Sequence, residues 1–289
     1  MAKRLRGEGN QVRVFDNLSS GKTSNLDAEL DLVTGDVRSG ADLGRAMRGV
    51  DAVLHLAAMT SVARSWKEPV DVLDVNTQGT VNVVEAARAA GVSVLIYSSS
   101  SSVYGNQPAR RKSEELPARP ISPYGHSKLM GEQYALLRAG AGMRVLALRY
   151  FNVFGPGQDP DSPYAAVIPR FLRHASEGTK AVIDGDGRQS RDFTYVENAV
   201  HANLLALRSD ASGLALNVAC GKAYTLLDVV HRIELVCGCS LRKEHGPARP
   251  GDIRHSLADL GRVERTIGYR PVVNFQEGIL RTYDAYRRP

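Results

Sequence analysis

The chain has 289 residues, of which 43% are hydrophobic and 24% are charged, and its net charge is +6 with a pI near 9.3. This composition excludes a disordered or fibrous protein and suits one large domain or two smaller ones. The basic residues are scattered and the few aromatic residues form no nucleic-acid-binding motif, so we expect no nucleic-acid partner. We attribute part of the positive charge to arginines that bind a phosphorylated substrate.

Cysteine usage and hydropathy exclude further classes. Cys220, Cys237 and Cys239 give no disulfide framework, and the closely spaced pair lacks the other ligands of a zinc site. We therefore expect buried, reduced thiols and no metal. The sequence contains no apolar run of about eighteen residues and does not open like a signal peptide. We expect a soluble, cytoplasmic protein with no membrane partner.

The first elements are the end of a helix and a strand. Residues 5–10 end a helix with glycines, and residues 11–15 alternate as a strand that runs into Asp16 and Asn17. In dinucleotide-binding folds an acidic residue at this place binds ribose hydroxyls, about twenty residues after a glycine-rich turn. No Gly-x-Gly-x-x-Gly pattern precedes Asp16.

Strands and helices then alternate. Residues 32–38 and 50–58 read as strands, and residues 70–90 read as a helix that stops at Gly91 and contains Asn76, a poor helix former. His55, within the second of these strands, could act as a base, but a histidine in a core strand is more often part of the hydrogen-bonded structure, and we adopt that interpretation. The apolar residues 92–96 predict a buried strand.

Serines follow this buried strand, at the edge where open α/β sheets place their ligands. About twenty residues later, two prolines lead into a helix that carries Tyr124 and Lys128, which share one face because they are four residues apart. A lysine ammonium near a phenol favours the phenolate and lowers the phenol pKa. A serine hydroxyl from the strand end could bond both the phenol and a substrate hydroxyl.

The second half of the chain contains shorter elements. Residues 144–150 predict a strand, a helix starts within residues 163–171, and residues 184–187 predict a hairpin-type turn. Residues 216–219 predict a strand, and the Thr225–Asp228 spacing predicts a capping box before a helix. The alternation of strands and helices predicts an α/β fold.

Four groups of residues carry a resemblance to a known family. Ser100, Tyr124 and Lys128 resemble the Ser/Tyr-x-x-x-Lys triad of short-chain dehydrogenases/reductases. Arg-Tyr-Phe-Asn at 149–152 before a Gly-Pro turn, Arg-Asp-Phe at 191–193 and Arg-x-Gly-Asp at 249–252 resemble the extended branch that acts on nucleotide sugars. The resemblance covers the whole chain and is closest to UDP-glucose and UDP-N-acetylglucosamine 4-epimerases, although many members have proline where this chain has Val153.

The resemblance implies a catalytic triad, an NAD site and a UDP-sugar site. The implied catalytic residues are Ser100, Tyr124 and Lys128. The implied NAD-binding residues are Asp16, Asn17, Ser20, Gly21, Asp36, Val37, Leu56, Ala57, Ala58, Thr60, Asn76, Ser98, Tyr124, Lys128 and Tyr150. The implied substrate-binding residues are Ser100, Ser102, Tyr124, Asn152, Arg191, Arg249, Asp252 and Ser256. In the family, the size of the residue at the last of these positions limits the substituent on C2 of the hexose.

The resemblance also implies the architecture. It implies a Rossmann-like, doubly wound parallel sheet in residues 1–155 and a smaller α/β substrate domain in residues 156–289, with part of the chain around 192–222 returning to the first domain. It further implies that the first strand, the phosphate-binding turn and half of the first helix are missing, and we expect the chain as written to bind NAD poorly. Family members commonly dimerise through the triad helix and the helix before it, so we expect a homodimer with a four-helix contact.

The implied activity is 4-epimerisation of UDP-glucose and UDP-N-acetylglucosamine through a 4-keto sugar. Related dehydratases carry an Asp-Glu pair where this chain has Ser101 and Ser102, and decarboxylases often carry glutamate at the second position, which argues against both. A 4-epimerase of UDP-glucuronate remains an alternative, because the sequence does not define the group on C6. A non-catalytic protein that binds nucleotide sugars is an alternative of another class, given the missing glycine turn.

Overall fold

The computed structural model describes residues 1–140, 142–162, 165–248 and 253–287. Its main sheet has the order β10-β5-β4-β3, and all neighbouring strands are parallel. These strands are β3 (Ala52–His55), β4 (Val94–Ser100), β5 (Arg144–Tyr150) and β10 (Leu214–Val218). β4 and β5 lie in the middle and are almost wholly buried. This explains why their sequences are continuous apolar runs rather than alternating ones.

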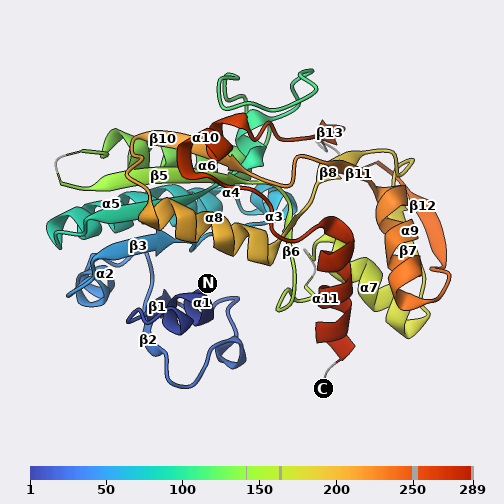
Figure 1. Ribbon diagram of the computed structural model, residues 1–289, viewed down its shortest axis with the longest axis horizontal. Coiled ribbons are helices and arrows are strands. Elements are labelled where there is room, and N and C mark those ends of the chain that lie inside the picture. Colours follow the sequence, from blue (N-terminus) through green and yellow to red (C-terminus); the bar gives the residue numbers. More distant parts are fainter. Residues whose placement is uncertain (141, 163–164, 249–252, 288–289) are drawn as a thin grey trace.

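Helices cover both faces of this sheet (Figure 1). Along β4, Leu95 and Tyr97 pack into one hydrophobic cluster, whereas Val94 and Ile96 pack into another, because successive side chains of a strand point to opposite faces. The first cluster contains residues of α2 (Gly40–Ala46), α5 (Gly79–Ala89) and α6 (Pro123–Leu137), and the second contains residues of α8 (Val196–Arg208) and α10 (Gly261–Ile267). The predicted α/β, doubly wound class is confirmed.

The first two strands form a sheet of their own. β1 (Arg13–Asp16) and β2 (Asp31–Thr34) are parallel to each other, and neither pairs with another strand among the described residues. They follow α1 (Ala2–Gly7) and flank the short helix η1 (Thr23–Asn25) at the bottom of Figure 1. β1 and β3 are therefore each paired along one edge only within the described part of the chain. Their residues are mostly half-buried or exposed, unlike those of β4.

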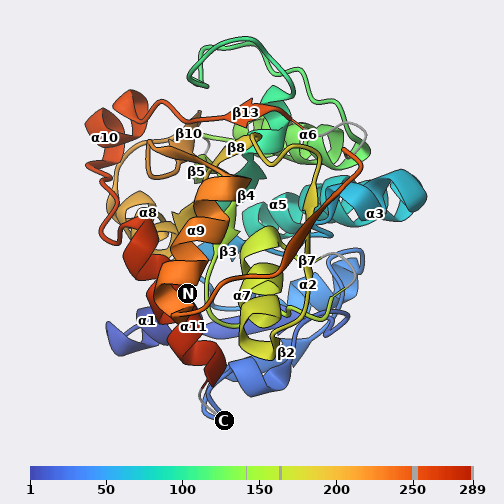
Figure 2. The ribbon, with the colours of Figure 1, turned by 90° about the vertical axis from the view of Figure 1, so that its right-hand side faces the viewer.

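The helix predicted over residues 70–90 is confirmed, with one irregularity. It consists of α4 (Pro69–Leu73), a π-helical turn η2 (Asp74–Gln78) and α5, and Asn76 lies in the wide turn. The short helix α3 (Val62–Lys67) precedes it and was not predicted. After β4, the chain forms the 3₁₀ turn η3 (Ser101–Tyr104) and a long loop, green at the top of Figures 1 and 2, before it enters α6.

The remaining elements include a separate hydrophobic cluster that contains Phe154, Phe171, Ile183, Val229 and Phe275. The helices are α7 (Val167–Glu177), α9 (Leu226–Cys237) and α11 (Phe275–Arg287), on the right of Figure 1. The strands are β6 (Val153–Phe154), β7 (Ala181–Asp184), β8 (Ser190–Asp192), β9 (Thr194–Tyr195), β11 (Ala223–Thr225), β12 (Lys243–Gly246) and β13 (His255–Ser256). The division of the chain near residue 155 stays a prediction.

Two predictions in this half have different outcomes. The capping box of α9 is confirmed, because Thr225 and Asp228 exchange side-chain and backbone hydrogen bonds. The hairpin at residues 184–187 is wrong: β7 pairs with β12, and β8 pairs with β11 and β13 in another sheet. The turn itself forms, with Gly185 and Gly187 at positive φ. The strands on either side of it pair with segments far along the chain and not with each other.

Candidate active site

Ser100, Tyr124 and Lys128 come from two elements that pack against each other. Ser100 ends β4, and its Oγ accepts a hydrogen bond from the backbone N–H of Ser102, 3.1 Å away. Tyr124 and Lys128 lie on α6, whose start is fixed by Ser122, since the Ser122 side chain caps the helix by accepting from Gly125 N. All three candidate catalytic side chains are less than 10% exposed, at 8%, 9% and 3%. The fold therefore holds them in fixed positions.

Burial governs the acid–base properties of this group. It raises the pKa of the Tyr124 phenol, and the interaction with the Ser100 side chain only opposes this rise. Burial also lowers the pKa of Lys128 to about 7, against the raising effect of Glu132. The expected lowering of the phenol pKa by Lys128 is thus outweighed by desolvation in the protein alone. In the protein alone, the raised pKa keeps the Tyr124 phenol protonated at neutral pH.

Asn76 connects the loop after β3 to α6. Its Oδ1 accepts from Met59 N at 2.8 Å, and its Nδ2 donates to Met59 O at 3.0 Å and to Ser127 Oγ at 3.0 Å. Ser127 in turn donates to Tyr124 O, so the asparagine supports the turn of α6 that carries the tyrosine. With both ends of its amide engaged and 1% exposed, Asn76 lies beneath the site.

His55 is part of the core, as its place in a strand predicts. Its Nε2 lies 2.9 Å from Thr80 Oγ1, and because that hydroxyl donates to Asn76 O, the imidazole is the donor. Burial lowers the pKa of His55 to about 3, so the ring is neutral.

Several candidate NAD-binding residues lie at the carboxyl ends of β1 and β2. Asp16 Oδ1 accepts from Leu18 N at 2.7 Å, and a Cβ on Gly21 would lie only 3.1 Å from the same oxygen. Among the described residues nothing donates to Asp16 Oδ2, so this half-buried carboxylate has one oxygen available for a ribose hydroxyl. Ser20 beside it is exposed. These features fit the adenosine end of NAD.

Asp36 and its neighbours are more tightly engaged. Arg38 donates to both oxygens of Asp36, and Asn17 Nδ2 donates to one of them, which lowers the pKa of that carboxyl. Val37 is buried against Gly79, where a Cβ would lie 2.6 Å from the valine. This contact explains why a glycine starts α5.

The remaining candidates follow the ends of the central strands. Leu56, Ala57 and Thr60 are exposed after β3, and Ala58 is half-buried. Ser98 in β4 is half-buried, and the half-buried Tyr150 at the end of β5 accepts a hydrogen bond from Asn203 Nδ2 at 2.7 Å. These ends meet at one edge of the parallel sheet.

The candidate substrate-binding residues belong partly to the β8–β13 region. Asn152 has a positive φ of 37° and donates from Nδ2 to Asp192 O at 2.9 Å. Arg191 and Ser256 are paired in register across β8 and β13, and Ser256 is buried. Ser102 lies half-buried in η3. Arg249 and Asp252 lie outside the described residues.

Sequence reasoning missed two groups of buried polar residues next to these candidates. Ser99, Glu132 and Arg149 form one hydrogen-bonded cluster. Asp192 is fully buried and accepts from the backbone N–H groups of Cys220 and Gly221. The first group had a detectable signal, because Glu132 follows Lys128 by four residues on the same helix. The second had none, because its partners are distant in the sequence.

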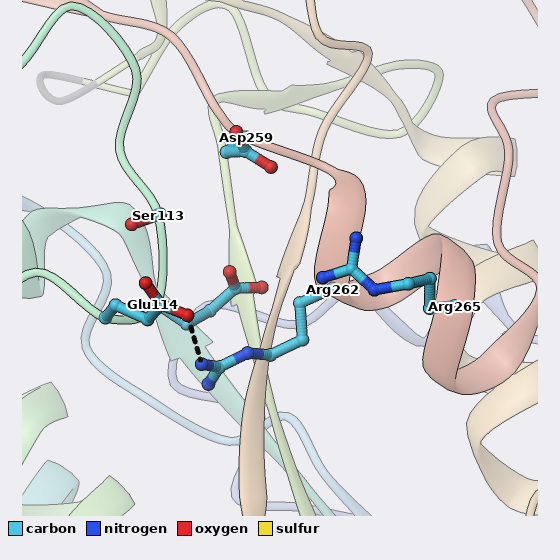
Figure 3. A pocket seen from close by; sticks show the side chains of 6 residues that line it. Ser113, Glu114, Asp259, Arg262 and Arg265 are labelled. Atoms are coloured by element: carbon cyan, nitrogen blue, oxygen red, sulfur yellow. Dashed lines mark ion pairs between the residues drawn. The ribbon is translucent and has the colours of Figure 1, made fainter.

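A cavity of about 250 Å³ lies apart from the triad. Figure 3 shows it between the loop that carries Ser113 and Glu114 and the α10 residues Arg262 and Arg265. Glu114 accepts from Asn217 N at 2.7 Å, at the end of β10. None of the candidate site residues in the described ranges lines this cavity.

Two kinds of feature are absent from the described residues. No helix in the described ranges is both long and apolar enough to span a bilayer. Histidine, cysteine and carboxylate side chains in the same ranges form no group of three that could hold a metal ion. The expected burial of the thiols is wrong, because Cys239 is exposed and Cys220 and Cys237 are half-buried.

Comparison with known proteins gives consistent matches. Residues 1–219 match the model of the NAD dependent epimerase/dehydratase family. The chain is 34% identical over 296 residues to UDP-glucose 4-epimerase of Mycolicibacterium smegmatis, across 99% of this chain and 94% of that protein. It resembles the crystal structure of UDP-glucose 4-epimerase from Thermotoga maritima with UDP-glucose (TM-score 0.95, 32% identity, 99% of this chain and 94% of that one). It also resembles UDP-N-acetylglucosamine 4-epimerase from Methanobrevibacter ruminantium in complex with UDP-N-acetylmuramic acid (TM-score 0.91, 38% identity, 96% and 90%).

Proposed function

The chain belongs to the NAD dependent epimerase/dehydratase family, and we propose that it interconverts the C4 epimers of UDP-hexoses with NAD as cofactor. The observation that carries the proposal is the buried group of Ser100, Tyr124 and Lys128 at the carboxyl edge of the sheet. A phenol, an ammonium and a hydroxyl that are held together out of water can remove a proton from an alcohol.

Each side chain has a role in this proposal. Tyr124, once deprotonated, accepts the proton of the sugar 4-hydroxyl. Lys128 supplies positive charge beside it, and Ser100 hydrogen-bonds the same sugar oxygen. When bound, NAD supplies the acceptor and donor of the hydride at C4.

The chain can hold parts of NAD through residues that fit it. Asp16 offers a free carboxylate oxygen to ribose hydroxyls, and the edge formed by Ala58, Ser98 and Tyr150 would take the nicotinamide end. No glycine-rich turn in the sequence supplies the backbone N–H groups that usually receive the pyrophosphate.

The substrate would be held by its diphosphate and nucleoside. We assign this to Asn152 and Arg191, together with Arg249 and Asp252, because guanidinium groups match phosphate geometry. An intermediate that must rotate without leaving needs such an anchor away from the reacting carbon. Ser256, small and next to Arg191 in the sheet, leaves room for an N-acetyl group on C2.

Residues 101 and 102 argue against a dehydratase. Both are serines at the start of η3, and neither can move a proton as a carboxylate would.

An epimerisation assay tests the proposal. The purified chain with added NAD is incubated separately with UDP-glucose, UDP-N-acetylglucosamine and UDP-glucuronate, and the C4 epimers are resolved by chromatography. We expect turnover of the first two, and Tyr124→Phe is expected to reduce kcat by about 10²–10⁴-fold. Turnover of UDP-glucuronate alone, or equal activity of the Tyr124→Phe variant, would contradict the proposal.

We also propose a homodimer. Three neighbouring helices, α3, α4 and α6, expose the large apolar side chains Trp66, Val70, Leu73, Met130 and Leu137, which are between 37% and 76% exposed. An apolar surface of this kind favours a second copy of the chain. Light scattering should give twice the chain mass, and Met130→Glu should give the monomer, whereas Val272→Glu, at an exposed apolar residue elsewhere, should not. A monomeric parent protein would refute the dimer.

A further inference from the structure

A buried ion pair lies one helical turn beyond Lys128. Arg149 donates to the Glu132 carboxylate from Nε over 2.9 Å and from Nη2 over 2.6 Å, and Ser99 Oγ donates to it over 2.5 Å. The glutamate is 2% exposed and the arginine 7% exposed. A carboxylate held by three donors out of water has a single well-defined position.

This cluster joins three elements at the level of the candidate catalytic group. Ser99 and Arg149 are paired in register across β4 and β5, and the next pair along the strands is Ser100 with Tyr150. Glu132 belongs to α6, the helix of the candidate tyrosine and lysine. This carboxylate therefore ties α6 to both strand ends, alongside the Tyr97 OH hydrogen bond to Lys128 O at 3.2 Å.

The hydrogen bonds continue from Arg149 into the loop after η3. Arg149 Nη1 donates to Tyr104 OH at 2.9 Å, and Tyr104 OH donates to Asn217 Oδ1 at 2.7 Å. Asn217 Nδ2 then donates to the backbone oxygens of Lys112 and Asp259. The cluster thus also anchors the loop that arches over the top of the molecule in Figure 2.

The charges around Lys128 come from few groups. From β3 it faces the neutral His55, from β4 the ring of Tyr97 at 4.6 Å, and from its own helix Tyr124 and Glu132. The α5 and η2 residues nearby, Thr80 and Asn76, are uncharged, and Arg149 of β5 is paired with the Glu132 carboxylate. Glu132 is the one carboxylate among the described residues that stabilises the Lys128 ammonium.

We propose that Glu132 is a positioning residue for the reaction: through Arg149 and Ser99 it helps to fix α6 against β4 and β5, and its charge favours the ammonium form of Lys128. This role rests on the proposed function, but one of its consequences, the titration of Lys128, can be measured without catalytic turnover. Without the carboxylate, the buried ammonium loses its opposite charge and is easier to deprotonate.

The test measures the titration of Lys128 in the full chain without cofactor. The 13Cε chemical shift of Lys128 is followed against pH in lysine-labelled protein and assigned with Lys128→Arg. Glu132→Gln, which keeps the shape and removes the charge, is expected to lower the titration midpoint by about one pH unit or more. Glu132→Asp keeps the charge and should leave the midpoint near that of the parent. Glu85→Gln is the matched control, since Glu85 also pairs with α6, through Arg138, but near the surface.

Kinetics test the positioning role. Glu132→Asp should reduce kcat by on the order of 10²-fold with KM unchanged, because a shorter arm shifts α6 against the strands. If Glu132→Gln does not fold because Arg149 is left unpaired, the double variant Glu132→Gln/Arg149→Met removes both charges and should fold while retaining the lowered midpoint.

The outcomes separate the two claims. A parent-like Lys128 midpoint in the folded Glu132→Gln or double variant would overturn the charge role, and a parent-like kcat in Glu132→Asp would overturn the positioning role. A parent chain that does not epimerise UDP-sugars, with a midpoint that still moves in Glu132→Gln, would overturn the proposed function and leave the charge role intact.

Discussion

Asn76 Nδ2 donates a 3.0 Å hydrogen bond to Ser127 Oγ, so a residue in a π-helical turn holds the first turns of α6 in place. A π-helical turn widens the helix locally, and such turns often lie at functional sites. Here the wide turn places the Asn76 amide between the loop after β3 and α6, where it bonds to both. The poor helix propensity of asparagine at this position is offset by its three hydrogen bonds.

The first prediction concerns this asparagine. Asn76→Ala leaves the Met59 backbone groups unpaired in the interior, and we expect a loss of about 2–4 kcal/mol in the free energy of unfolding, at about 1–2 kcal/mol for each lost contact. We also expect kcat to fall on the order of tenfold, because Ser127 loses a partner beneath Tyr124. Urea denaturation and the epimerase assay measure the two effects. Asn82→Ala, whose side chain caps the Val37 carbonyl nearer the surface, should affect stability less and leave kcat unchanged.

The second prediction concerns pH and stability. Burial raises the pKa of Asp192 to about 6 from its usual 3.8, despite the backbone N–H groups that it accepts from. The folded chain therefore keeps this proton up to about pH 6, whereas the unfolded chain releases it near pH 3.8, so the stabilisation falls as pH rises through this window.

Asp192→Asn stays neutral at every pH and isolates this effect. The free energy of unfolding of the parent relative to the variant should decrease between pH 4 and pH 7 by on the order of 1–3 kcal/mol, measured by urea denaturation. Asp186 is a control with the opposite pH dependence, because Arg254 lowers its pKa. Asp186→Asn should lose most free energy of unfolding, relative to the parent, at neutral pH. A difference for Asp192→Asn that grows with pH would contradict the assignment.

How much the sequence predicts depends on whether the signal is local. The strand ending at Ser100, the helix carrying Tyr124 and the capping box at Thr225 follow from runs, spacing and capping residues within a few positions. The partners of β8 do not, because Ser190 pairs with residues 225 and 255, far along the chain. The separation of β1 from β3 likewise depends on which strand edges meet, which no local pattern contains.

The site shows the same limit. The tyrosine and lysine were recognisable because four residues separate them on one helix. The burial that raises the Tyr124 pKa depends on the whole fold. The lysine neighbour alone predicts a lowered pKa and does not include this effect. The sequence indicates Arg149 only as part of a motif. Its pairing with Glu132 depends on the packing of α6 against β5, which no local pattern contains.

The third prediction concerns the close approach of α6 to β4. A Cβ on Gly131 would lie 2.4 Å from Tyr97 OH and 3.2 Å from Thr80 Oγ1, and the tyrosine is fully buried with its OH bonded to Lys128 O. Gly131→Ala is therefore expected to lower the free energy of unfolding by about 1–3 kcal/mol through overpacking. Gly44→Ala, in α2 with nothing within 4 Å, should instead raise it by up to about 1 kcal/mol. Thermal denaturation of both variants checks the contrast, and a stabilised Gly131→Ala would show that the helix can move away from β4.

The last prediction concerns substrate choice at Ser256. This residue is buried in β13 and in register with Arg191, so a larger side chain there would take space next to the proposed anchor of the UDP group. Ser256→Tyr should lower kcat/KM for UDP-N-acetylglucosamine at least about tenfold more than for UDP-glucose, since a filled pocket rejects the larger C2 substituent. Ser256→Ala removes the hydroxyl without filling the space and should leave the ratio of the two kcat/KM values unchanged. An equal loss for both sugars in Ser256→Tyr would mean that residue 256 does not face C2, because a general distortion of β13 weakens both substrates alike.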